Sequence, residues 1–280
     1  MKRRNIGKIL AFLLVFIFTA SNLSVFANSA PPPPPPPPVP RTYNVGEPNP
    51  HSRSTNNSFD GALPASPEEI AYWNAFWRTH TIEDVLRMQG FTDTQIAATF
   101  TPTFVPFNQW IMVSRFRYVG QETGITCGAA VARMSLYTIN GWAPNEFTVL
   151  NGFPRLTMYP EGGTTTRSLQ SYLAEMTRVW YNRIYDADQV VLTKALEASI
   201  RMHNRPSILQ VYPQRSHGFP YDLNNRHFVA TYGVSHAQAR TWFAIADPWG
   251  GYNNNRAWEL FTLDAENLHS AYIQNGGILW

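Results

Sequence analysis

The only cysteine among the 280 residues, Cys127, is the first candidate for chemistry. A single cysteine cannot form an internal disulfide, so its thiol needs another explanation. A helix starting at Cys127 would place the thiol at a helix N-terminus, where free N–H groups and the helix dipole favour a thiolate. Gly128 and Ala129 would leave space above the sulfur for a substrate backbone. We interpret Cys127 as a nucleophile; the alternative is a buried, inert cysteine.

A thiol nucleophile needs a base, and His227 is the best placed of the seven histidines. It opens a strand-like segment, residues 227–234, and a side chain at the mouth of a strand is fixed by the sheet while still facing a cleft. His217, in a predicted loop, is the main rival. We predict that His227 holds Cys127 as an ion pair and later protonates a leaving amine.

Asp247 is the predicted partner of His227. It follows the strand-like segment 242–246, and an antiparallel pairing with residues 227–234 would bring Asp247 beside His227. There it would accept the Nδ1 proton and fix the tautomer of the ring. The alternative is a turn residue, because Pro248 follows and Asp-Pro commonly opens a turn.

Gln121 completes the candidate site. Its amide would donate to a developing oxyanion together with the backbone N–H of Cys127; the alternative is an ordinary polar loop residue. This chemistry requires no metal or other cofactor, and no spacing of residues predicts a metal site.

The elements that must position these residues change type along the chain. The loop 213–226 is expected to form one wall of the cleft. Helices are predicted to start near residues 66, 81, 92 and 127 and to cover 166–177, 190–203 and 264–273. Strands are predicted over 107–118, 207–212, 227–234, 242–246 and 278–280. Helices followed by an antiparallel sheet predict an α+β fold.

The N-terminal part is expected to lie outside the catalytic domain. Residues 1–27 are typical of a signal peptide, with a basic start, an apolar run and a small-x-small cleavage site. Residues 28–65 are a proline-rich and polar linker that includes eight consecutive prolines. Residues 66–105 are a helical pro-segment, an accessory region or the first part of the main domain. Residues 106–280 are the predicted catalytic domain.

Charge and hydropathy exclude two classes of partner. The first 27 residues hold four of the 22 basic side chains and none of the 19 acidic ones, so the mature chain has 18 basic and 19 acidic residues. This balance does not favour nucleic-acid binding. The apolar run near the N-terminus has about 12 residues, and a membrane span needs about 20. We expect an exported, secreted protein with no membrane span after signal removal.

Three motifs resemble those of a known family: Gln-x5-Cys-Gly-Ala-Ala, His-Phe-Val-x3-Gly and Asp-Pro-Trp-Gly-Gly. In this order they resemble the papain-like cysteine peptidases, in particular exported relatives of the double-glycine peptidases that process bacteriocins. The resemblance covers residues 107–280 and implies a papain-like fold. It also implies a peptide or polypeptide substrate and roles for Gln121, Cys127, His227 and Asp247. Unlike the leader-cutting members, this chain is expected to carry an export signal and no membrane domain.

Two other functions stay open at this point. A transpeptidase or an amidase of cell-wall peptides would use the same residues, with cell-wall association as a consequence. A catalytically inactive surface-binding protein would keep the fold and bury an unreactive Cys127.

Overall fold

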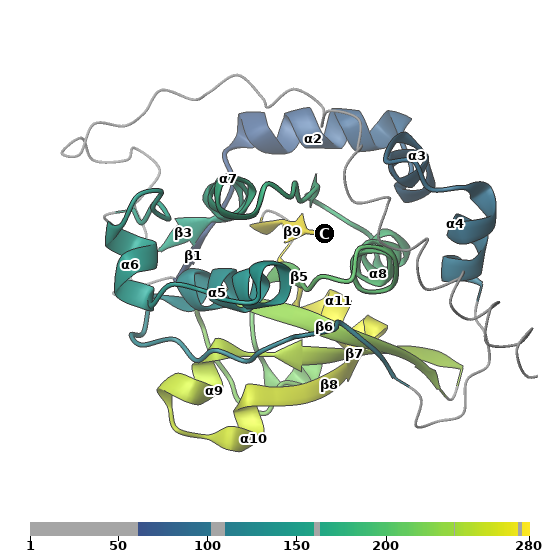
Figure 1. Cartoon of the computed structure of the whole chain (residues 1–280). Helices are drawn as coiled ribbons and strands as arrows, with labels where there is room; N and C mark the ends of the chain where they lie inside the picture. Colours follow the sequence, from purple (N-terminus) through teal and green to yellow (C-terminus); the bar gives the residue numbers. More distant parts are fainter. Residues whose placement is uncertain (1–60, 102–109, 160–162, 238, 274–275) are drawn as a thin grey trace, which may run out of the picture.

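The computed structural model describes residues 61–101, 110–159, 163–237, 239–273 and 276–280 (Figure 1). The predicted signal peptide and most of the predicted linker lie outside these residues. Within the described ranges, no helix combines the length and the apolar character needed to cross a membrane.

Three short helices follow the linker, and they start near residues 66, 81 and 92 as the sequence predicts. Ser66, Thr81 and Thr92 are the N-caps, and each side chain accepts a hydrogen bond from the backbone N–H three residues on. In Figure 1 the three helices run along one edge of the molecule. They are α2 (Pro67–Thr79), α3 (Ile82–Met88) and α4 (Asp93–Phe100).

These helices pack into the body of the fold. Trp73 and Leu86 are fully buried, and Glu69 of α2 forms a buried ion pair with Arg183. The indole N–H of Trp77 donates to the backbone oxygen of Arg183 at 2.7 Å. The three helices are thus packed against the rest of the described chain.

A seven-stranded sheet forms the centre of the molecule. Its order is β4-β9-β5-β6-β7-β8, with β2 paired to β6, and every pairing is antiparallel. The strands are β2 (Ile111–Met112), β4 (Arg183–Ile184), β5 (Ser207–Val211), β6 (His227–Ala237), β7 (Arg240–Ala246), β8 (Leu260–Asp264) and β9 (Ile278–Leu279). A separate parallel pair joins β1 (Ala62–Leu63) to β3 (Thr164–Thr165).

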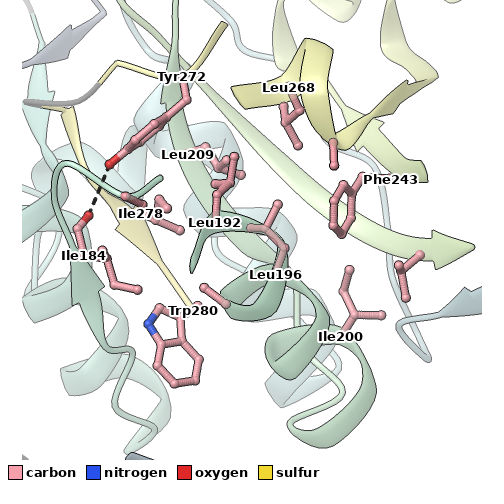
Figure 2. Close-up of a cluster of buried hydrophobic side chains, with 14 of the residues drawn as sticks. Ile184, Leu192, Leu196, Ile200, Leu209, Phe243, Leu268, Tyr272, Ile278 and Trp280 are labelled. Carbon is pink, nitrogen blue, oxygen red and sulfur yellow. Dashed lines mark hydrogen bonds between the residues drawn. The ribbon is translucent and has the colours of Figure 1, made fainter. Parts of the chain in front are cut away.

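Helices cover both faces of this sheet, so the central strands are buried on both sides. Leu209 and Val229 belong to one hydrophobic cluster, while their neighbours Ile208 and Phe228 belong to the other. Figure 2 shows the first cluster, where Leu192 and other side chains meet the sheet. The remaining helices are α5 (Cys127–Asn140), α6 (Glu146–Asn151), α7 (Thr166–Thr177), α8 (Gln189–Glu197) with its π-helical continuation η2 (Ala198–Met202), the 3₁₀ turn η3 (Arg215–His217), α9 (Pro248–Tyr252), α10 (Arg256–Glu259) and α11 (Ala265–Ala271).

The structure thus has the predicted mixture of helices and antiparallel sheet, with local differences. Of the strand predicted over 107–118, only β2 forms, and residues 107–109 lie outside the described part. The edge strand β8 and the short helices α6, α9 and α10 were not predicted.

Candidate active site

Cys127 is the first residue of α5, as the sequence predicts. Its N-cap, Thr126, makes no side-chain cap hydrogen bond, and Cys127 itself is fully buried. The expected role of Gly128 is wrong. A methyl group at position 128 would lie 2.3 Å from the Cγ2 of Thr164, so the glycine lets α5 pack closely instead of leaving space for a substrate.

His227 and Asp247 are brought together by the β6–β7 pairing. Ala230 pairs with Ala246, so the start of β6 lies beside the end of β7. The Nε2 of His227 lies 2.7 Å from the Oδ1 of Asp247, and both side chains are almost completely buried. The neighbourhood of the two residues therefore follows from strand register.

The predicted use of the ring nitrogens is wrong. Nε2 of His227, and not Nδ1 as expected from the sequence, contacts Asp247. The ring also hydrogen-bonds the side chain of Cys127, and with Nε2 committed to Asp247, Nδ1 is the nitrogen left for the thiol. Strand pairing fixes which strand ends lie side by side, whereas the rotation of the His227 ring depends on the side chains that pack on each side of it.

Two tyrosines and a tryptophan, none of them predicted, hold Asp247. The hydroxyl of Tyr221 donates to its Oδ2, and the backbone N–H of Trp249 donates to its Oδ1 at 2.9 Å. The hydroxyl of Tyr118 donates to the backbone oxygen of Asp247 and accepts from the N–H of Gly251. Tyr221 comes from the loop 213–226, which was expected to wall the cleft; nothing in its local sequence marks it as a partner of Asp247.

The electrostatics favour a charged histidine. Burial by itself would lower the pKa of His227, but the charges of Asp247 and Cys127, with side-chain hydrogen bonds to both, outweigh burial and raise this pKa to about 10. The Trp249 ring meets the imidazole edge to face, with centroids 6.2 Å apart. At neutral pH the arrangement therefore supports an imidazolium at His227.

Gln121 lies in the loop before α5 and is also buried. Its Nε2 donates to the backbone oxygen of Thr123 at 2.6 Å, while its Oε1 has no hydrogen-bond partner within the described residues. The same loop is held by Glu146, whose carboxylate accepts from the backbone N–H of Glu122. Burial is the main cause that raises the pKa of Glu146. One amide hydrogen of Gln121 is thus engaged in the loop.

His217, the rival base, lies in η3, and its Nδ1 is buried with no hydrogen-bond partner among the residues described. Among all the residues that the structure describes, no group of three or more His, Cys, Asp or Glu side chains could hold a metal ion.

Comparison with known proteins gives distant structural likenesses. No protein-family model matches the sequence, and no curated protein matches it. Among solved structures, the chain is similar to digestive procathepsin L 3 of Tenebrio molitor larval midgut, with 10% identity, a TM-score of 0.42, and 76% of this chain and 87% of that chain covered. It is also similar to UfSP from C. elegans, with 11% identity, a TM-score of 0.40, and 77% of this chain and 45% of that chain covered.

Proposed function

We propose that this chain is an exported papain-like cysteine peptidase that hydrolyses peptide bonds through Cys127, His227 and Asp247. The observation that carries the proposal is the contact between the buried thiol at the start of α5 and a histidine whose other nitrogen lies 2.7 Å from Asp247. A thiol, a base and a group that orients the base are the parts that nucleophilic acyl transfer needs.

In the first half of the reaction, the Sγ of Cys127 attacks the carbonyl carbon of the scissile bond as a thiolate. The imidazolium of His227 gives its proton to the nitrogen of the leaving amine, and the C–N bond breaks. The products of this half are a free amine and a thioester between the acyl group and Cys127. Asp247 keeps the ring oriented and stabilises its positive charge.

In the second half, water attacks the thioester carbonyl and gives a proton to His227. The C–S bond then breaks, the carboxylic acid leaves, and Cys127 returns as a thiolate beside the imidazolium. An amine that reached the thioester first would form a new amide bond instead, which is the transpeptidase alternative.

We propose that the oxyanion is held by backbone N–H groups at the start of α5, with Gln121 as a second donor. A helix N-terminus carries N–H groups without intrahelical partners, which suits a developing negative charge. For Gln121, the amide hydrogen that is not bonded to Thr123 is the one available for this task.

The test is peptide hydrolysis by the full chain, followed by mass spectrometry of the products from a peptide mixture. We expect new peptide termini with the wild type, none with Cys127→Ala or His227→Ala, and unchanged cleavage with the control His217→Ala. Adding a free amine separates hydrolysis from transfer, because a transpeptidase would give amide products. Cleavage that survives in Cys127→Ala would refute the proposed nucleophile.

A further inference from the structure

A cavity outside the candidate active site lies at the opposite end of β6. His236, near the end of this strand, lines the cavity, whereas His227 starts the strand, so the two residues lie about 30 Å apart. The cavity has a volume of about 500 Å³, which suits a small molecule. Its lining comes from α4, α8, β6, β7 and the start of α11, and it includes Phe100, Val190, Lys194, Glu197, Arg240 and Glu266.

Glu197 brings a buried carboxylate to this cavity. Its side chain is 5% exposed, and no group within the described ranges donates a hydrogen bond to it. The Nε2 of His236 lies 3.3 Å from its Oε1 but is not aligned as a donor, and a guanidinium nitrogen of Arg201 lies 3.7 Å from its Oε2, beyond hydrogen-bond distance. Because buried carboxylates normally accept hydrogen bonds, these oxygens are open to a donor that enters the cavity.

The cations around the cavity are engaged by other groups. Lys194 pairs with Glu83 at 2.5 Å, and Arg240 pairs with Asp264 at 2.8 Å. The guanidinium of Arg201 donates to two backbone oxygens of α4. Each of these donors thus satisfies an acceptor of its own, and the carboxylate at the cavity keeps its unmet need for N–H donors.

Glu197 also lies where its helix changes type. It is the last residue of α8, and the chain continues directly as the π-helical turn η2. Such π-helical turns are rare and frequently occur at functional sites. Burial raises the pKa of Glu197 to about 7 and lowers the pKa of His236, so the nearby imidazole is neutral at neutral pH and does not compensate the carboxylate.

We propose that this cavity binds a small organic cation, one that carries N–H donors on a short apolar stem. The donors would bond the carboxylate of Glu197, and the stem would pack against Phe100 and Val190, which line the same cavity. The aromatic face of Phe100 suits a cation as well, because its quadrupole attracts positive charge. This inference goes beyond the proposed peptidase function and does not depend on it.

The test is isothermal titration calorimetry of the full chain with benzylamine at about pH 8, where Glu197 is mostly ionised and the amine is protonated. Benzyl alcohol, which has the same shape without the charge, should bind at least about tenfold more weakly. Glu197→Gln should weaken the binding of benzylamine by about tenfold or more. The matched control is Glu266→Gln, the same change of charge at an exposed position of the same cavity, which should alter binding by less than about twofold.

A second measurement follows the affinity for benzylamine between about pH 6 and pH 8. The affinity of the wild type should rise with pH, because the ionised form of Glu197 holds the cation, and that of Glu197→Gln should not show this rise. The variant keeps every other charged or titratable side chain around Glu197, so it separates their effects from that of the carboxylate; they are Glu83, Lys194, Arg201, His236, Arg240, Asp264 and Glu266. Near-ultraviolet circular dichroism shows that the variants are folded.

Three results would overturn the cation site: no binding of benzylamine to the wild type up to about 10 mM, equal binding of benzyl alcohol, or equal binding to Glu197→Gln. The first two need no variant, so the proposal stays testable even if the substitution disturbs folding. A parallel titration with N-acetyl-lysine amide identifies the source of the cation, because tighter binding than that of benzylamine would indicate a lysine side chain and weaker binding a free amine. None of these readouts involves peptide cleavage, so they do not bear on the proposed peptidase function.

Discussion

The hydroxyl of Tyr221 offers the sharpest single test of how the site is held together. It donates to the Oδ2 of Asp247, a carboxylate that is 0% exposed, and Tyr221 itself is 3% exposed. Tyr221→Phe removes this donor and little else. The Oδ2 would then lose its hydrogen bond in a place that water does not reach, and a hydrogen bond to a charged group contributes about 1.5–3 kcal/mol.

The assay is equilibrium unfolding in urea at neutral pH, with thermal melting as a second probe. We expect the free energy of unfolding to fall by about 1.5–3 kcal/mol with an unchanged m-value. For a domain of about 200 residues this corresponds to a melting temperature lower by about 3–12 °C. Peptide cleavage should fall as well, because Asp247 orients His227.

Tyr172 provides the matched control. It is also 3% exposed, and its hydroxyl makes no hydrogen bond within the described part of the chain. Tyr172→Phe should change stability by less than about 0.5 kcal/mol. Equal losses in the two variants, or no loss in Tyr221→Phe, would show that the contact with Asp247 does not stabilise the fold.

Three further predictions concern charged groups. The raised pKa of His227, about 10, means that its protonated form favours the folded state. This stabilisation should be complete below about pH 6.5 and lost as pH rises through 10. The free energies of unfolding of the wild type and His227→Gln should therefore converge as pH rises over that window. Burial raises the pKa of Glu197 to about 7, against the opposing effect of nearby cations. The protonated carboxyl therefore favours the folded state below about pH 4.5, and this stabilisation is lost as pH rises through 7. The free energy of unfolding of the wild type should fall by about 3 kcal/mol between these pH values, and that of Glu197→Gln should not show this fall. Glu69→Ala should lower the free energy of unfolding by about 3–5 kcal/mol, because it leaves the buried Arg183 without its partner. Replacing the exposed Asp93 by alanine should lower it by less than about 1 kcal/mol in the same assay. Similar losses in the two variants would show that the burial of the ion pair does not determine its contribution.

Local signals in the sequence predicted most of the helices. Ser66, Thr81 and Thr92 act as caps in the structure, and Gly141 ends α5 in the left-handed conformation, with φ at 77°. A cap needs only residues three or four positions away, so it can be read without the fold. The edge strand β8 was missed because its stability comes from pairing with β7, and only part of it is buried.

The candidate site also combines features that local sequence predicts with contacts that form only in the folded chain. Local patterns predict that the cysteine starts a helix, that His227 starts a strand and that Asp247 follows the next strand, because each of these is a property of neighbouring residues. The folded chain is needed to see which nitrogen of His227 meets Asp247, that Tyr221 donates to the carboxylate, and that Gly61 lies against the thiol. These contacts join residues from separate loops and strands, and their geometry depends on how helices pack against the sheet, which no local pattern encodes.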